Sequence, residues 1–230
     1  MNHYWLNHYE KSAAEFVSQP LKQVGKTVHG VDVSPEQVQL IVKNIARVLD
    51  LNASDTLVDL CCGNGVLTTQ LARMSGMVIG VDFSSGLLEA ARSNSASANI
   101  EYSQMDVTDL SESIIDRASK YSMYGALQHL SSDDFDGLLS RIGGRRGALK
   151  LLVGGVPDLS CLRCFYVSDE NYRFYQEREK SGNPHLGRWW TQDELAQAAA
   201  RNGYIVTIIP QPPGLYTSHY RFDALFERLA

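Results

Sequence analysis

Two hydrophobic patterns alternate along the chain from residue 56 onward. Short apolar runs of strand length, at 56–60 and 77–81, are each followed by a segment with the spacing of a helix, at 66–74 and 85–96. Ser84 stands where the second helix needs a capping side chain. Strands that alternate with helices in this way are typical of βα units, so the pattern predicts a parallel sheet with helices packed on it.

The same reading extends to the rest of the chain. Further strands are expected at 100–104, 121–126 and 147–155, and a closing pair at 204–210 and 219–229. A sheet that ends in such a hairpin has an antiparallel final strand. We therefore predict an α/β fold with a seven-stranded, mostly parallel, doubly wound sheet whose final strand is antiparallel.

Two further helices have clear boundaries. The segment 34–49 opens with a Ser-Pro pair, which suits a cap followed by the first helical residue. The segment 191–203 has Thr191 and Glu194 at the two positions of a capping box and a glycine at its end. Both are therefore predicted as helices.

The domain organisation follows from where this regular pattern stops. Residues 1–33 are rich in aromatic residues and have no clean period, so we treat 1–50 as an N-terminal helical cap segment. Residues 51–230 form the main domain. Its connection at 156–190 is long and aromatic, and long connections in compact domains are usually functional, so we expect a lid-like insertion there.

Composition limits the kind of partner. The net charge of −5 provides no long-range attraction to phosphate backbones, so we expect a small-molecule partner and no nucleic acid. No apolar run approaches the length of a membrane span, and the first residues lack the pattern of a secretory signal. We expect a cytoplasmic protein with no membrane partner. The sequence does not predict an oligomeric state.

The four cysteines allow two interpretations. Cys161 and Cys164 have C-x-x-C spacing, and with Cys61 and Cys62 they would supply the four sulfurs of a zinc site. Adjacent ligands in a glycine loop would have to point the same way, which disfavours that site. Reduced thiols without a metal are the favoured interpretation.

Three aspartates recur at the ends of predicted strands. Asp59 lies at the end of the first, Asp82 follows the second and Asp106 follows the third. Since the carboxyl ends of adjacent parallel strands line one crevice, these carboxylates should face one elongated ligand. Gly63 and Gly65 would let the backbone turn tightly and approach that ligand.

A nicotinamide cofactor is the rival ligand for such a loop. Its fingerprint G-x-G-x-x-G requires a third glycine where this chain has Thr68. Asp59 in the mouth of the loop would repel a pyrophosphate but attract an ammonium group. The acids therefore favour a ligand with a cationic amine, a ribose and an adenine.

Four segments in order resemble the motifs of class I S-adenosylmethionine-dependent methyltransferases. They are LVDLCCGNG at 57–65, VIGVDFSSGLLEAAR at 78–92, IEYSQMDVTDL at 100–110 and YGALQHLSSDD at 124–134. The resemblance covers about residues 55–155. It implies S-adenosylmethionine as the cofactor and S-adenosylhomocysteine as the product.

The resemblance also implies which residues bind the cofactor. Asp59 and the glycine loop would hold the methionyl end, Asp82 the two ribose hydroxyls, and Asp106 with its neighbours the adenine. The full set that it implies is Asp59, Cys61, Gly63, Asn64, Gly65, Asp82, Phe83, Met105, Asp106, Val107 and Tyr124. Many members carry glycine where Cys61 stands, which is the one departure in the loop.

Methyl transfer from a sulfonium is an in-line displacement that needs a positioned nucleophile and, for some acceptors, a base. His129, just after the fourth strand, is our first candidate for a general base; a packing role is the alternative. Arg221 suits a carboxylate or phosphate of the substrate, and His219 shares its face of the expected strand. A surface salt bridge or packing at the strand end is the alternative.

Other residues are expected around the acceptor. Trp189 and Trp190 would wall an aromatic or sugar acceptor, with core packing as the alternative. Lys26 and Thr27 lie in a G-K-T sequence that lacks the other glycine and the strand of a phosphate loop, so we expect them to close over the cofactor.

The acceptor motifs of nucleic-acid enzymes are missing after the fourth strand. Neither an Asn/Asp-Pro-Pro-aromatic run nor a Pro-Cys pair occurs at 124–130. We expect methylation of a small metabolite, with oxygen favoured over nitrogen. The alternatives are a methyltransferase that acts on RNA or protein, and a cofactor-binding subunit without catalysis.

Overall fold

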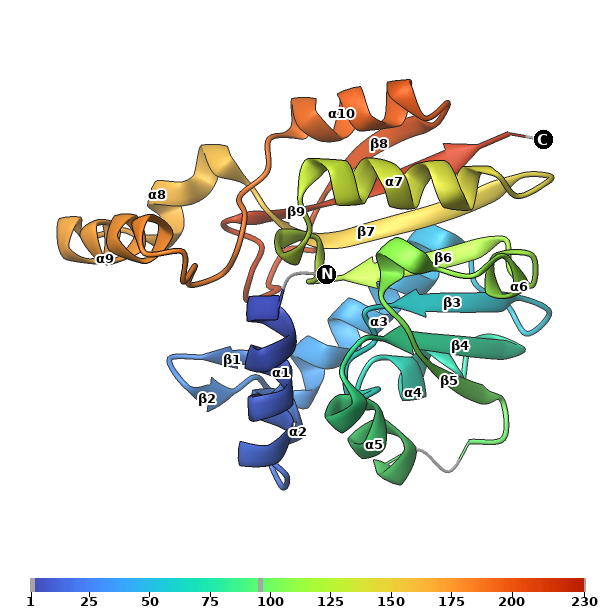
Figure 1. The fold of residues 1–230 in the computed structure, drawn as a ribbon, viewed down its shortest axis with the longest axis horizontal. Coiled ribbons are helices and arrows are strands. Elements are labelled where there is room, and N and C mark those ends of the chain that lie inside the picture. The colour runs from blue at the N-terminus through green and yellow to red at the C-terminus, as the bar shows by residue number, and fades with distance from the viewer. Residues whose placement is uncertain (1–2, 95–96, 230) are drawn as a thin grey trace.

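The computed structural model describes residues 3–94 and 97–229, and a seven-stranded sheet runs through it (Figure 1). The sheet order is β5-β4-β3-β6-β7-β9-β8; β9 runs antiparallel to both β7 and β8, and the other neighbouring pairs are parallel. This confirms the predicted fold. The strands are β3 (Thr56–Leu60), β4 (Met77–Asp82), β5 (Ile100–Gln104), β6 (Lys120–Tyr124), β7 (Leu149–Pro157), β8 (Ile205–Pro210) and β9 (Arg221–Arg228).

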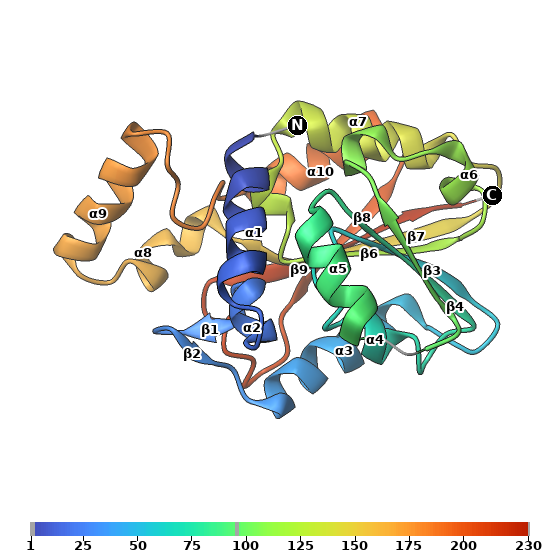
Figure 2. The same ribbon diagram turned by 60° about the horizontal axis from the view of Figure 1, so that its bottom comes forward.

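Helices cover both faces of this sheet. One hydrophobic core packs α7 and α10 against one face, and a second packs α3 and α4 against the other (Figures 1 and 2). Strands buried on both faces are mostly apolar, as β3 and β7 are, with Asp59 in β3 and Lys150 in β7 as the charged exceptions. The helices are α3 (Pro35–Leu49), α4 (Thr68–Leu71), α5 (Ser85–Asn94), α6 (Glu112–Ile115), α7 (Ser132–Gly143) and α10 (Gln192–Arg201).

Local capping explains where several helices begin. Thr191 and Glu194 form the predicted capping box, and the Ser84 hydroxyl accepts a hydrogen bond from the Leu87 amide at 3.1 Å. Ser34 occupies the cap position of α3 without a side-chain bond. α4 is shorter than the segment predicted at 66–74, because turns replace regular helix on both sides of it. Residues 95–96 of the predicted second helix lie outside the described residues.

The N-terminal segment folds as a cap across the sheet edge. It contains α1 (His3–Glu15), α2 (Pro20–Gln23) and a small hairpin of β1 (Thr27–Val28) and β2 (Val31–Asp32). α1 packs across α5, and a Cβ at Gly86 would lie only 3.0 Å from the Cβ of Ala13 (Figure 2). The absence of a side chain at Gly86 therefore lets the two helices approach closely.

The insertion at 156–190 holds two further helices, α8 (Leu162–Phe165) and α9 (Asp169–Lys180), which project beside α1 (Figures 1 and 2). An aromatic cluster that includes Tyr166, Trp189 and Tyr220 holds its base. The Tyr4 hydroxyl of α1 donates to the carbonyl of Pro184 at 3.3 Å. The insertion and α1 therefore contact one another.

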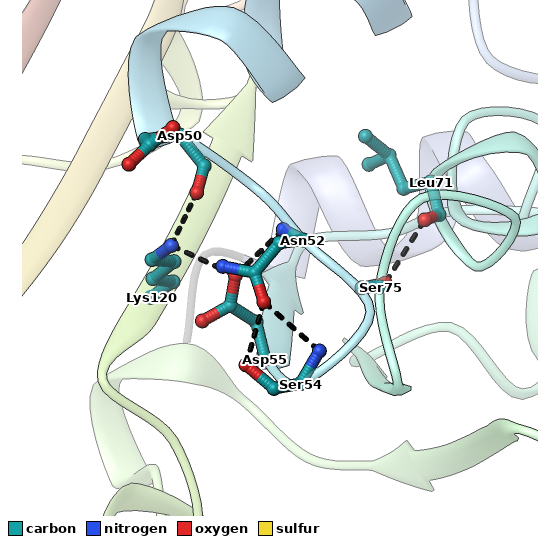
Figure 3. A network of polar contacts seen from close by, with 7 residues as sticks. All are labelled: Asp50, Asn52, Ser54, Asp55, Leu71, Ser75 and Lys120. Carbon is teal, nitrogen blue, oxygen red and sulfur yellow. Dashed lines mark hydrogen bonds and ion pairs between the residues drawn. The ribbon is translucent and has the colours of Figure 1, made fainter.

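A polar network joins the amino ends of β3 and β6, at the edge of the sheet opposite to the carboxyl ends of these strands (Figure 3). The Lys120 ammonium donates to the Asp55 carboxylate at 2.8 Å and to the carbonyl of Asp50. Asn52 and Ser54 complete the turn before β3. These contacts stiffen the end of the sheet that carries no candidate chemistry. Among the described residues, no helix is long and apolar enough to cross a bilayer.

Candidate functional site

A cavity of about 110 Å³ opens at the carboxyl edge of the parallel strands. The ends of β3, β4 and β6 and the turn after β5 face it, because parallel strands all present their carboxyl ends at this edge. Eleven of the expected site residues line it: Lys26, Asp59, Cys61, Gly63, Asp82, Phe83, Met105, Asp106, Val107, Tyr124 and His129.

The loop after β3 turns through left-handed backbone conformations. Cys61, Gly63 and Gly65 have φ angles of 55°, 57° and 75°. The left-handed region is unfavourable for a residue with a Cβ, so Cys61 carries strain that glycine would relieve. A Cβ at Gly63 would lie 2.9 Å from the Val24 side chain, so the N-terminal cap presses directly on the loop.

Asp82 is the last residue of β4 and binds the loop that follows β3. Its carboxylate accepts hydrogen bonds from the Gly63 amide at 2.8 Å and the Ser84 amide at 2.9 Å. Burial raises the pKa of Asp82 to about 6 despite these bonds. A carboxylate has about four acceptor positions, so Asp82 retains capacity for ligand hydroxyls.

Asp59, near the end of β3, is as buried as Asp82. Its two oxygens accept hydrogen bonds from the Thr68 and Ser122 hydroxyls, each at 2.7 Å. Burial raises the pKa of this carboxyl group, while the two hydroxyls and Lys26 oppose that effect. The hydroxyls orient the carboxylate, and its remaining acceptor positions suit a cationic ligand group.

The loop thiols are poor nucleophiles. Burial and the neighbouring acids, Asp82 first among them, raise the pKa of Cys61 and of Cys62 well above the ordinary value. Since the thiolate is the reactive form, both side chains serve as small packing groups. Among residues 3–94 and 97–229, no group of three or more His, Cys, Asp or Glu side chains is placed to hold a metal.

Helix α1 forms the roof of the cavity through Trp5 and Tyr9. The Tyr9 hydroxyl lies 2.9 Å from Nε2 of His129, and the Trp5 ring packs on the His129 ring with centroids 4.0 Å apart. Sequence reasoning missed both α1 residues. The signal available was their spacing of four in an aromatic-rich segment, which places them on one face of a helix.

His129 differs from the base expected from the sequence. Burial first, and then Arg221, lower the pKa of His129 to about 3. The imidazole is therefore neutral near pH 7, but its low basicity disfavours simple proton abstraction. Its contacts to Tyr9 and Trp5 favour a positioning role instead.

Two cations approach the cavity from opposite ends of the chain. Lys26 is 9% exposed, lines the cavity, and has its ammonium 5.7 Å from the centroid of the Tyr124 ring. Arg221 at the start of β9 donates to the carbonyl of Gly155 and, at 3.4 Å, to the side-chain oxygen of Gln128. Burial and Arg221 lower the pKa of Lys26 to about 8.

The other expected site residues do not line the cavity. Two of them are structural in the loop: the Asn64 amide donates to Pro20 and Gln23 of α2, and a Cβ at Gly65 would clash with Tyr102. The tryptophans pack elsewhere, and His219 is exposed at the surface. The expected residues outside the lining are Asn64, Gly65, Thr27, Trp189, Trp190, His219 and Arg221.

The insertion at 156–190, which we expect to act as a lid, does not line the cavity. None of the lining residues comes from 156–190, and the roof is made by α1. The insertion contacts α1 through the Tyr4 hydroxyl, which donates to the Pro184 carbonyl and accepts from the Arg178 guanidinium. A lid function of the insertion stays a prediction.

Comparisons with known proteins agree with this geometry. Residues 57–144 match a family model described as a methyltransferase domain. A 2-phytyl-1,4-naphtoquinone methyltransferase of Nostoc sp. (strain PCC 7120) is 39% identical over 75 residues, which cover 31% of this chain and 31% of that protein. A 23S rRNA (uracil(1939)-C(5))-methyltransferase of Haemophilus ducreyi is 26% identical over 180 residues, which cover 76% of this chain and 37% of that protein.

A solved structure resembles the chain over its whole length. Magnesium protoporphyrin IX methyltransferase from Synechocystis PCC 6803, with bound SAH, aligns with a TM-score of 0.62 at 14% identity, over 99% of this chain and 95% of that one. The chain matches less than half the length of each of these curated relatives. Residues 57–144 are thus similar to a methyltransferase domain, and the whole chain has the fold of that methyltransferase structure.

Proposed function

We propose that this protein transfers a methyl group from S-adenosylmethionine to a small-molecule acceptor. The observation that carries the proposal is the convergence of Asp59, Asp82 and Asp106 with the glycine loop on one cavity. That set of groups suits an ammonium, a ribose diol and an adenine lying in a row.

The chemistry of the cavity fits this cofactor. Asp59 and Asp82 each bind protein donors through their oxygens and still have acceptor positions left. Met105 and Val107 offer apolar surface on either side of Asp106. Phe83 adds an aromatic face, and apolar walls with a few convergent polar groups are typical of cofactor sites.

The bound cofactor would supply an electrophilic methyl group. The acceptor atom attacks the methyl carbon as the carbon–sulfur bond breaks, sulfur keeps the electron pair, and the acceptor loses its proton to solvent or a nearby base. The protein contributes mainly position, which accounts for large rate effects in displacements of this kind. Trp5, Tyr9 and His129 form the wall on which the acceptor would be held.

The enclosed, largely aromatic roof favours a small acceptor. We favour oxygen over nitrogen as the methylated atom, because a hydroxyl can share hydrogen bonds with Tyr9 and His129 on its approach. A hydroxyl acceptor also loses its proton on methylation, and Tyr9 and His129 are polar groups in the lining that would accept a hydrogen bond from it.

The proposal is tested in two steps. Calorimetric titration of S-adenosylhomocysteine should show binding to the wild-type protein and weaker binding to Asp82→Ala, by about 1–3 kcal/mol. Incubation with methyl-labelled cofactor and a metabolite extract should then yield a labelled small molecule. Absence of any cofactor binding would contradict the proposal as a whole.

RNA is the second candidate acceptor, because the Haemophilus ducreyi relative is an rRNA enzyme and matches across 76% of this chain. The net charge of −5 weighs against it. Label incorporated into total RNA, and not into the small-molecule fraction, would favour this alternative.

A further inference from the structure

We propose that Gln211 and Asp223 are positioning residues, which hold the ring of Tyr124 in place as a wall of the cavity. Tyr124 is the last residue of β6 and lines the cavity. Gln211 follows β8 and Asp223 lies in β9, and neither lines the cavity. The inference rests on the proposed function, because it concerns the cavity in which the cofactor and its acceptor would bind.

Two glycines of β7 leave room for the Tyr124 ring. A Cβ at Gly154 would lie 2.4 Å from one carbon of the ring, and a Cβ at Gly155 would lie 3.3 Å from another. The ring therefore packs directly on the backbone of β7. Glycines offer no side chain to hold the hydroxyl end of the ring, so the position of that end depends on a polar contact.

Gln211 supplies this polar contact. Its side-chain nitrogen donates to the Tyr124 hydroxyl oxygen at 2.9 Å and to the Asp223 carboxylate at 3.0 Å. Its side-chain oxygen accepts a hydrogen bond from the Thr217 hydroxyl at 2.6 Å. Gln211 is only 5% exposed, and these three bonds use both of its N–H groups and its carbonyl. The buried amide therefore has one orientation.

Asp223 is a buried acid that the proposed reaction does not use. The Gly155 amide donates to it at 2.8 Å and the Asn44 side chain donates to it at 2.7 Å, in addition to Gln211. Among the described residues, no lysine or arginine forms an ion pair with it. Burial raises the pKa of Asp223, and the three nitrogen donors oppose that effect because they stabilise the charged form.

The direction of each hydrogen bond along this chain of contacts is determined. The exposed Arg47 guanidinium can only donate, and it donates to the Asn44 side-chain oxygen at 2.8 Å. The Asn44 nitrogen therefore faces Asp223, and the carboxylate in turn requires the nitrogen of Gln211. The second N–H of that nitrogen reaches Tyr124. A side chain at the surface thus fixes, through three buried ones, the group that holds the ring.

Tyr124 contributes through its position and not through its ionisation. Burial first, and then the Asp223 charge, raise the pKa of Tyr124 well above its ordinary value, so the phenol keeps its proton near neutral pH. Loss of the Gln211 bond would free the hydroxyl end and let the ring move into or away from the cavity. Because displacement reactions depend strongly on how the reactants are placed, such movement would alter both binding and rate.

The first test is a double-mutant cycle on the full-length protein. S-adenosylhomocysteine is titrated by calorimetry into wild type, Gln211→Met, Tyr124→Phe and the double variant. Each single change removes the same bond, so each should weaken binding by roughly three-fold to ten-fold, and the double variant should bind no more weakly than the weaker single variant. Losses that multiply in the double variant, or single variants that bind as wild type does, would overturn the inference.

Tyr204→Phe is the matched control for these variants. Tyr204 is buried, and its hydroxyl donates to the Leu139 carbonyl at 2.9 Å outside the cavity. The change should lower the free energy of unfolding and leave the affinity for S-adenosylhomocysteine unchanged. An equal loss of affinity in Tyr204→Phe would mean that the cycle reports general destabilisation, which also overturns the inference.

An exchange of two side chains tests Asp223 and carries the test if Gln211→Met fails to fold by circular dichroism. Asp223→Asn sets two amide nitrogens against each other, and Asn44→Asp sets two carboxylates against each other. The double variant Asn44→Asp/Asp223→Asn again pairs a donor with an acceptor at every contact, including that of Arg47. Each single change should weaken binding by roughly three-fold to ten-fold, and the exchange should restore it to within about two-fold of wild type. An exchange variant as weak as the single variants would overturn the assignment of Asp223.

A third measurement does not depend on the cofactor. In protein with isotopically labelled tyrosine rings, the NMR signal of Tyr124 is the one that disappears in Tyr124→Phe. This signal should shift or broaden in Gln211→Met and stay unchanged in Tyr204→Phe. If wild type does not bind S-adenosylhomocysteine, the proposed function fails, and the ring signal still decides whether Gln211 positions Tyr124. An unchanged signal in Gln211→Met would overturn the inference.

Discussion

The Tyr9 hydroxyl lies 2.9 Å from Nε2 of His129, and this contact joins the roof helix α1 to the turn that follows β6. Both side chains line the cavity, so the contact closes the site and shapes its acceptor wall at once.

Replacing Tyr9 by phenylalanine tests this contact directly. The change leaves His129 Nε2 buried without its partner and loosens the acceptor wall, so kcat should fall by roughly ten-fold to a hundred-fold. The Kd for S-adenosylhomocysteine should change little, because the cofactor acids lie on other elements. Steady-state kinetics and calorimetry measure the two effects.

Tyr166→Phe is the matched control, because Tyr166 makes an equivalent bond to Nδ1 of His185 at 3.0 Å outside the cavity. It should leave kcat unchanged. Equal losses in both variants would mean that the effect of Tyr9→Phe is general destabilisation.

The low pKa of His129 predicts a pH dependence of stability. The unfolded side chain titrates near 6.5, whereas the folded one titrates at about 3, so only the unfolded state gains a proton between these values. Stability from this group is therefore complete above pH 6.5 and falls as the pH decreases toward 3. Urea unfolding at pH 7.5 and 5.0 should show a smaller pH effect in His129→Asn than in wild type.

The low pKa of His129 also predicts how the methylation rate depends on pH. If His129 stays neutral, its protonation does not affect the reaction. The pH profile of the methylation rate near pH 6.5 should then have the same shape in wild type and in His129→Asn. A step at that pH that depends on His129 would restore the general-base role expected from the sequence.

The raised pKa of Asp82 predicts a pH dependence of cofactor binding, and a contribution to stability whose pH dependence is opposite to that of His129. Its folded pKa of about 6 exceeds the ordinary 3.8, so the folded free protein holds a proton that the unfolded chain has lost, and this contribution to stability disappears as the pH rises through 6. The ionised carboxylate is the better acceptor for ribose hydroxyls. Affinity for S-adenosylhomocysteine should therefore rise from pH 5 to 7, and Asp82→Asn should flatten that rise.

Two glycines in helices, Gly86 in α5 and Gly137 in α7, allow a matched test of the packing of α1 on α5. A Cβ at Gly86 would press on Ala13 and Glu10 of α1 at 3.0 Å, whereas a Cβ at Gly137 in α7 would meet nothing within 4 Å. Gly137→Ala should stabilise the protein by about 0.5–1 kcal/mol through helix propensity. Gly86→Ala should lose that gain and increase hydrogen exchange in residues 3–15, with chemical denaturation and mass spectrometry as the measurements.

Substitutions at Cys61 test whether this position matters for its backbone conformation or for the chemistry of its thiol. Its φ of 55° suits glycine, so Cys61→Gly should keep cofactor binding and change the free energy of unfolding by less than about 1 kcal/mol. Cys61→Val places a β-branched side chain in the same conformation and should destabilise by about 1–3 kcal/mol. Loss of methyl transfer in a well-folded Cys61→Gly protein would reveal a chemical role for the thiol.

The fold was predictable because its signal is local and repeated. Asp59 and Asp82 lie at the ends of strands, and Asp106 follows one. The apolar runs of these strands mark them in the sequence, and parallel pairing then brings the three acids together without further information. The antiparallel final strand followed from two adjacent strand-like runs.

The roof was not predictable in the same way. Tyr9 meets His129 across 120 positions of chain, and no local pattern encodes that pairing. Trp189 and Trp190 were expected at the acceptor but pack in hydrophobic clusters. Tryptophan suits both a binding wall and a core, so the residue type alone does not distinguish the two locations. The depressed pKa of His129 depends on burial by those distant elements, so an ordinary histidine pKa was the natural expectation.

The sheet order β7-β9-β8 has a consequence for how the chain reaches its folded state during synthesis. β8 leaves the ribosome before β9 but has no direct place beside β7, because β9 must insert between them. Until then β7 presents an open edge that favours pairing with other chains. We expect the interval before residues 221–228 emerge to be the period when nascent chains most need chaperone protection.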